Sequence, residues 1–165
     1  MEKISYKTLT FEIDKEKTLN LSEAIPACAC PACENFRKSV KNNFSEMCAF
    51  LTDIIGIDPD SAASNECYTL DDGRIEYSPR YCIIGKVIDG SDERLQLGSC
   101  LLTIEKTGGI LKEATTDESF VIAISGVVLP YTLDVPLYFE QKKPIVKRGP
   151  LKNFFDRLFN WVFKK

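Results

Sequence analysis

Histidine is absent from this chain of 165 residues. Histidine is the side chain most often used as a general base near neutral pH, and it is also the most common metal ligand. Its absence excludes Ser-His-Asp and Cys-His catalysis, together with histidine-ligated catalytic zinc. No serine lies in a nucleophile-elbow sequence, and Gly108-Gly109 lacks the surroundings of a phosphate-binding loop. We therefore expect a protein that is not an enzyme.

Long apolar runs are missing as well. No stretch approaches the roughly 20 apolar residues that a membrane-spanning helix needs, and the first residues are too polar for a secretory signal. We therefore expect a cytoplasmic protein in a reducing compartment. There its seven cysteines are thiols or metal ligands and not disulfides.

Charge is distributed unevenly along the chain. Residues 142–165 contain eight basic residues and one acidic residue, so this segment carries +7, and the net charge of −3 leaves −10 for residues 1–141. We expect an α+β domain over residues 1–141, followed by a basic linker and an amphipathic helix over residues 142–165.

Hydrophobic spacing predicts the elements of that domain. We expect a mostly antiparallel sheet of about five strands packed on one long helix. The helix covers residues 31–55, and Gly56 is its C-cap. Residues 18–25 suggest a short helical turn, and residues 58–73 suggest a loop. Turn-like sequences separate the expected strands, which are residues 6–13, 76–88, 95–106, 120–129 and 135–140.

Three cysteines form a C-x-C-x2-C motif, Cys28, Cys30 and Cys33, at the start of the expected helix. In one interpretation their thiolates bind structural zinc, and Cys67 or Cys48 supplies the fourth ligand. No second C-x2-C pair strengthens that interpretation.

Two other interpretations of the same cysteines remain open. Cys30 at the helix N-cap, with Pro31 at the first helical position, is typical of thiol oxidoreductases, because the helix dipole stabilises a thiolate there. Alternatively, the three small side chains simply pack the entrance of the helix. Cys48, Cys82 and Cys100 lie in apolar patterns and are expected in the core.

Several short motifs occur together in this chain. They are C-x2-C-x-N-F at residues 30–36, G-I-D-P at 56–59, the strand Y-C-I-I-G-K-V-I at 81–88, and a late strand at 120–129 that exits through P-Y-T-L. This combination, from Thr8 to Tyr138, resembles a family of small bacterial proteins to which no activity is assigned. Cys28 is additional to that pattern. Local explanations suffice for three motif residues: Asn35 bonds a neighbouring loop, Phe36 packs inward, and Asp58 shapes the turn before a proline.

The end of the chain has the pattern of an amphipathic helix. Its apolar stripe with flanking cations consists of Leu151, Phe154, Phe155, Leu158, Phe159 and Trp161, with Lys152 and Arg157 beside it. Such a helix docks on its own domain, on an anionic membrane surface or in the groove of a protein partner. Nucleic acid is not expected as a partner, because the remainder of the chain is acidic.

Two hypotheses of function follow. In the first, the protein is a non-catalytic accessory or interaction protein, whose basic C-terminal helix contacts a partner or associates peripherally with a membrane. It has no cofactor. In the alternative, the cysteine cluster carries the function, through structural zinc or thiol redox exchange.

Overall fold

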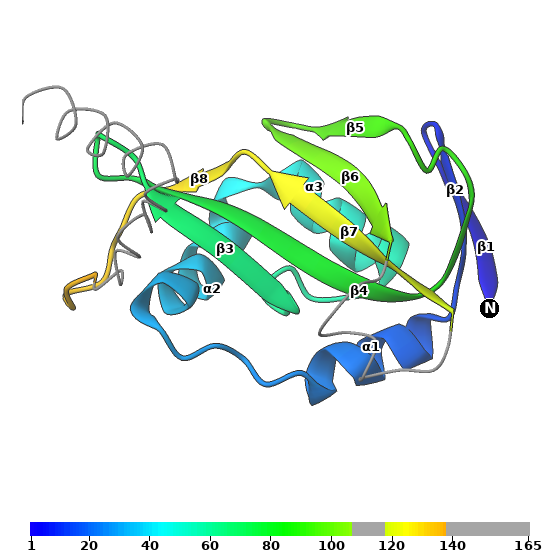
Figure 1. Cartoon of the computed structure of the whole chain (residues 1–165), viewed down its shortest axis with the longest axis horizontal. Helices are drawn as coiled ribbons and strands as arrows, with labels where there is room; N and C mark the ends of the chain where they lie inside the picture. The colour runs from blue at the N-terminus through cyan, green and yellow to red at the C-terminus, as the bar shows by residue number, and fades with distance from the viewer. Residues whose placement is uncertain (107–117, 138–165) are drawn as a thin grey trace, which may run out of the picture.

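The computed structural model describes residues 1–106 and 118–137. The described residues form an α+β fold built on one eight-stranded antiparallel sheet (Figure 1). Six strands follow the order β1-β2-β4-β7-β6-β5, and β3 and β8 also pair with β4. The strands are β1 (Glu2–Tyr6), β2 (Leu9–Ile13), β3 (Ser64–Thr69), β4 (Ile75–Asp89), β5 (Arg94–Leu97), β6 (Cys100–Lys106), β7 (Ser119–Ser125) and β8 (Val127–Leu129). The helices are α1 (Lys15–Ala24), α2 (Pro31–Asn43), α3 (Ser45–Ala49) and the π-helix η1 (Phe50–Ile55).

Strand β4 organises the sheet, because other strands pair along both of its edges. Strands β3 and β2 follow each other along one edge, and β8 and β7 follow each other along the other. Pro79 lies inside this long strand although it has no N–H. Pro79 opposes Asn65 of β3 at a non-hydrogen-bonded position, so an N–H at residue 79 would point away from β3, toward the edge of β4 that pairs with β7 and β8. On that edge Pro79 faces the change from β7 to β8 at Gly126 and has no pairing partner, so its missing N–H leaves no strand hydrogen bond unmade.

The core lies between the sheet and the helices on one of its faces. Phe36 of α2 contacts the ring of Tyr77 on β4 at 5.2 Å between centroids, and Phe50 of η1 contacts Tyr6 at 5.0 Å. Phe11 and Phe120 stack within the sheet at 5.5 Å. These aromatic contacts hold α2 and η1 against the strands.

The prediction of one long helix over residues 31–55 is wrong. Helix α2 ends at Asn43, and Phe44, with φ −133° and ψ 66°, is not helical. The Asn43 side chain donates to the Ser39 carbonyl at 2.7 Å, and asparagine in this position competes with the helical backbone pattern. The chain then re-enters a helix in α3 and widens to a π-helix in η1, whose C-cap is Gly56 in the left-handed region, as predicted.

The prediction of about five strands is wrong too, because turns divide the apolar runs. Residues 6–13 belong to the hairpin of β1 and β2, and residues 95–106 form the hairpin of β5 and β6. Residues 120–129 are divided between β7 and β8. Strand β3 lies in the segment expected to be a loop. Residues 135–137 are not a strand, and residues 138–140 lie outside the described part of the chain.

The expected helical turn at residues 18–25 is the helix α1, which begins earlier. Asp14 is its N-cap and accepts a hydrogen bond from the Lys17 N–H at 3.1 Å. Thr18 is buried, and its Oγ1 accepts from the Ile84 N–H of β4 at 3.0 Å. Helix α1 and its N-cap Asp14 therefore supply the hydrogen-bond partners of the Ile84 N–H and carbonyl, which lie between the segments of β4 that pair with β3 and with β2.

Candidate functional site

The cysteine cluster, defined as Cys28, Cys30 and Cys33, lies where the connection from α1 enters α2. Its three Sγ atoms all lie within 4.8 Å of one another. Cys28 and Cys30 are exposed, and Cys33 is buried. The structure therefore brings the three predicted metal ligands of this motif together at one point.

The local sequence explains this geometry. Cys30 is the N-cap of α2, with Pro31 in the first turn, and its Sγ accepts from the Cys33 N–H at 3.5 Å. Arg37, one helical turn further, donates from Nη1 to the Cys28 carbonyl at 2.8 Å. The positive end of the helix dipole and this guanidinium both favour negative charge on the sulfur atoms.

The thiols have different proton affinities. Hydrogen bonds from the Cys30 main chain and from the Cys30 and Cys33 side chains, together with the charge of Arg37, lower the pKa of Cys28. Burial raises the pKa of Cys33 well above its ordinary value, and its hydrogen bonds with the other two thiols act in the same direction. Cys28 is therefore the more readily ionised of these two thiols.

A buried polar network fixes the first turn of α2 beneath the cluster. The Tyr77 hydroxyl donates to the Ala32 carbonyl at 2.9 Å and accepts from Asn35 Nδ2 at 3.1 Å. Asn35 Nδ2 also donates to the Pro130 carbonyl at 3.0 Å, and Asn35 Oδ1 accepts from the Thr132 N–H at 2.9 Å. The prediction that Asn35 bonds a neighbouring loop is confirmed, and Phe36 packs inward as predicted.

Cys67 lies on β3 opposite Tyr77 and is half-buried. Its Sγ is not one of the three atoms within 4.8 Å. Its pKa is raised, first by burial and then by the charges of Cys30 and Cys28, so Cys67 is close enough to sense the cluster. Its role as a fourth ligand stays a prediction.

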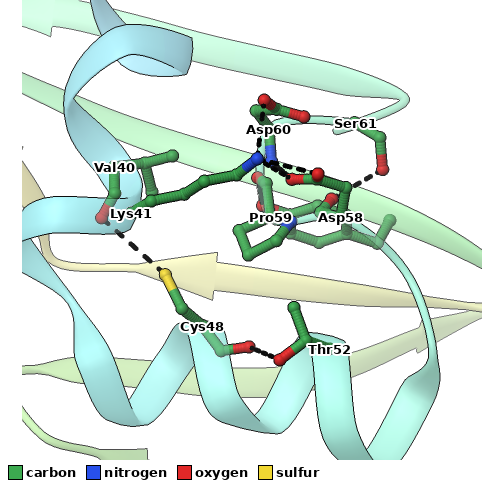
Figure 2. Close-up of polar contacts among 9 residues, drawn as sticks. Val40, Lys41, Cys48, Thr52, Asp58, Pro59, Asp60 and Ser61 are labelled. Atoms are coloured by element: carbon green, nitrogen blue, oxygen red, sulfur yellow. Dashed lines mark hydrogen bonds and ion pairs between the residues drawn. The ribbon is translucent and has the colours of Figure 1, made fainter.

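The remaining cysteines lie elsewhere. Cys48 Sγ donates to the Val40 carbonyl at 3.7 Å, between α2 and α3 (Figure 2). Cys82 and Cys100 are buried in the sheet, as predicted.

A cavity of about 400 Å³ adjoins the cluster. Cys28, Cys33 and Arg37 line one side of it, and the segment from Asp60 to Asn65 lines another. The Asn65 side-chain amide is buried, and within the described residues neither Nδ2 nor Oδ1 has a hydrogen-bond partner. Asn65 was not predicted from the sequence. Its spacing of two residues from Cys67 would place both side chains on the same face of a strand, and that is the signal that could have indicated it.

An ion-pair network holds the chain that leads into β3 (Figure 2). Lys41 Nζ of α2 lies 2.7 Å from the Asp58 carboxylate and 3.1 Å from Asp60 Oδ2. The Asp58 carbonyl accepts from the Ser61 hydroxyl at 2.6 Å. The Tyr81 hydroxyl donates to the Pro59 carbonyl, also at 2.6 Å. Asp58 is thus a turn residue, as predicted, and the network fixes one wall of the cavity.

The predicted contact residues of the amphipathic tail lie outside the described part of the chain, as does the basic linker before them; they are Leu151, Phe154, Phe155, Leu158, Phe159, Trp161, Lys152 and Arg157. In residues 1–106 and 118–137, no helix has both the length and the apolar character that crossing a membrane requires.

The chain was compared with known proteins at three levels. No protein-family model matches it, no curated protein matches it, and no solved structure matches it.

Proposed function

We propose that this chain is a zinc-binding accessory protein whose metal ligands are the thiolates of Cys28, Cys30 and Cys33. The observation that supports the proposal is the convergence of three Sγ atoms within 4.8 Å. Zinc–sulfur bonds of about 2.3 Å in a tetrahedral site place two thiolates about 3.8 Å apart. Rotations that bring the sulfurs closer by about 1 Å would therefore complete three corners of a zinc site.

Zinc at this position would have a structural role. The three ligands lie within six residues of one another, at the junction between the connection from α1 and the first turn of α2. An ion held there would fix this connection against the helix, and its binding energy would add to the stability of the fold. The N-terminus of α2 and Arg37 would compensate part of the negative charge of three thiolates.

The test is metal content and coordination in the full-length protein. We expect one equivalent of zinc after purification without chelator. Cobalt substitution should produce thiolate-to-cobalt charge-transfer absorption. Each of Cys28→Ser, Cys30→Ser and Cys33→Ser should weaken metal binding at least tenfold. Cys48→Ser is the matched control, because Cys48 is a half-buried thiol outside the cluster.

Thiol redox exchange is the second candidate function. It is favoured by the N-cap position of Cys30 and by the hydrogen bond from the Cys33 N–H to its sulfur. Rapid alkylation of Cys30 at neutral pH and reversible formation of a Cys30–Cys33 disulfide, in protein that binds no metal, would support redox exchange and contradict zinc binding.

A further inference from the structure

The cysteine cluster supplies three sulfur donors, whereas a structural zinc site is almost always tetrahedral with four ligands. In the described ranges, no cysteine, aspartate or glutamate joins Cys28, Cys30 and Cys33 as a fourth member of the group. A zinc ion at the cluster would therefore need a fourth ligand that moves in when the ion binds. Four further cysteines are present, and their positions in the fold decide which of them can reach the ion.

Three of these four cysteines lie too far away. The Cys48 thiol donates to the Val40 carbonyl, which lies about 15 Å along α2 from its N-cap. Cys82 lies about 17 Å along β4 from Tyr77, the residue that contacts the first turn of α2, and it is on the opposite face of the sheet. Cys100 lies on β6, which is two strands, or about 10 Å, away from β4.

Cys67 differs from them because it faces the first turn of α2. It opposes Tyr77 across β3 and β4, so the two side chains are neighbours on one face of the sheet. The Tyr77 hydroxyl donates at 2.9 Å to the carbonyl of Ala32. Ala32 lies between Cys30 and Cys33 in the chain. Cys67 is thus adjacent to the side chain that joins the sheet to the cluster's own helical turn.

The cavity beside the cluster supports the same placement. Asn65 lies two residues before Cys67, on the same face of β3, and it lines this cavity together with Cys28 and Cys33. The face of β3 that carries Cys67 therefore adjoins the cluster. The pKa of Cys67 is raised first by burial and then by the charges of Cys30 and Cys28, which agrees with this proximity.

From these features we infer that Cys67 supplies the fourth thiolate, so that one zinc ion joins β3 to the connection between α1 and α2. This inference rests on the proposed zinc site. Closing the site requires movement, and rotation of a cysteine side chain between staggered rotamers displaces its sulfur by about 3 Å. On binding, the Cys67 thiol releases its proton to solvent, and its sulfur donates an electron pair to the ion in place of water. No atom is oxidised or reduced.

A zinc–sulfur bond from Cys67 would change how β3 is held. Among the described strands, β3 pairs with β4 alone, and most of its residues are exposed. Its attachment therefore depends on one set of strand hydrogen bonds and few buried contacts, which is typical of segments that open locally. A metal bond to the N-terminal region of α2 would add a second attachment, on the face of β3 that carries Cys67.

The experiment is X-ray absorption spectroscopy at the zinc edge on the full-length protein, prepared with a phosphine reductant so that no external thiol is present. We expect four sulfur neighbours at about 2.3 Å in the parent. Cys67→Ser should show three sulfurs and one oxygen, and should bind zinc at least tenfold more weakly. Cys48→Ser is the matched control, because Cys48 is the other half-buried thiol, and it should keep four sulfurs.

Hydrogen exchange provides a second readout, which reports on the strand and not on the metal. Addition of zinc should slow amide exchange in β3 at least tenfold in the parent and in Cys48→Ser. In Cys67→Ser, zinc should leave exchange in β3 unchanged while it still slows exchange in the first turn of α2. The coordination number of the parent tests the inference even if Cys67→Ser fails to fold.

Two results would overturn the inference and leave the zinc site intact. Three sulfurs and one oxygen around zinc in the parent would make the fourth ligand water or a carboxylate such as that of Glu23, which lines the cavity. Four sulfurs retained in Cys67→Ser would assign the fourth sulfur to a second copy of the chain. A parent protein that binds no zinc would instead reject the proposed function, and the inference with it.

Discussion

Asn35 illustrates how one buried side chain can hold distant segments together. It is fully buried, and its amide joins α2 to Tyr77 of β4 and to the segment that contains Pro130 and Thr132. Asn35→Ala would leave buried hydrogen-bonding groups without partners. We expect a loss of about 3 kcal/mol in the free energy of unfolding, measured by urea denaturation. Asn20→Ala, on the surface, should change it by less than about 0.5 kcal/mol.

Asp58 and Asp60 should respond to pH in opposite directions. Burial raises the pKa of Asp58, but hydrogen bonds from Lys41 and from the main chain of Asp60 outweigh it, so the pKa lies below 3.8. Its contribution to stability is therefore present at neutral pH and is lost as the pH falls through the folded-state pKa. Burial and the neighbouring Asp58 raise the pKa of Asp60 above 3.8, so acidification relieves an unfavourable charge there.

Substitution separates these two effects. Asp58→Asn should lower the free energy of unfolding at neutral pH by less than about 1 kcal/mol, because the ion pair is half-exposed, and should make the remaining stability less sensitive to acid. Asp60→Asn should make the free energy of unfolding fall more steeply with acid, because protonation of Asp60 no longer offsets the loss at Asp58. Urea denaturation of both variants, at neutral pH and below the ordinary aspartate pKa of 3.8, measures the difference. Equal acid sensitivity of the two variants would contradict this assignment.

At the scale of elements, the pairing of β2 with β4 depends on Gly85. It has φ +143°, and a Cβ at this position would lie 2.0 Å from the Glu12 carbonyl oxygen of β2. Gly85→Ala should therefore destabilise the protein by more than about 3 kcal/mol or prevent folding. Gly73→Ala is the control. It has φ +81° but no atom within 4 Å of the added Cβ, so only backbone strain of about 1 kcal/mol is expected. Thermal unfolding of the two variants measures the difference, and equal losses would show that no close approach exists at Gly85.

Elements with strong local signals were predictable from the sequence, and those fixed by distant contacts were not. Gly56 ends the helical region because a left-handed C-cap requires glycine, and that signal is local. The break at Phe44 was missed, because the apolar spacing continues through it and outweighs the weaker local signal of Asn43, whose side chain competes with the helical backbone. Strand β3 is polar and was expected to be a loop, but its pairing with β4 makes it a strand.

In the candidate site, too, the features with a local sequence signal were predictable and those made by distant contacts were not. The short spacing of Cys28, Cys30 and Cys33 was enough to predict a cluster, since the N-terminus of a helix folds these positions together. The cavity forms, and Asn65 lies beside it, because the start of β3 lies next to the connection between α1 and α2. These two segments are far apart in the sequence. No local pattern reveals such proximity.

For the whole molecule, the contrast between an acidic chain and a basic C-terminal segment gives a prediction about surfaces. Residues 142–165 carry +7 and the apolar stripe described above. We expect the full-length protein to sediment with vesicles that contain anionic lipid, and more weakly at high salt. Removal of residues 150–165 should abolish sedimentation and leave thermal unfolding of the domain unchanged. Loss of cooperative unfolding on truncation, with no vesicle binding by the full chain, would show that the segment is part of the core.

The central claim is that three thiolates of one cluster hold a metal ion. Native mass spectrometry of the full-length protein, purified without chelator, tests it most directly. The account predicts one bound zinc in the parent and in Cys48→Ser, and none in the triple variant Cys28→Ser, Cys30→Ser, Cys33→Ser. A parent protein that carries no metal and takes up none when zinc is added would contradict the account.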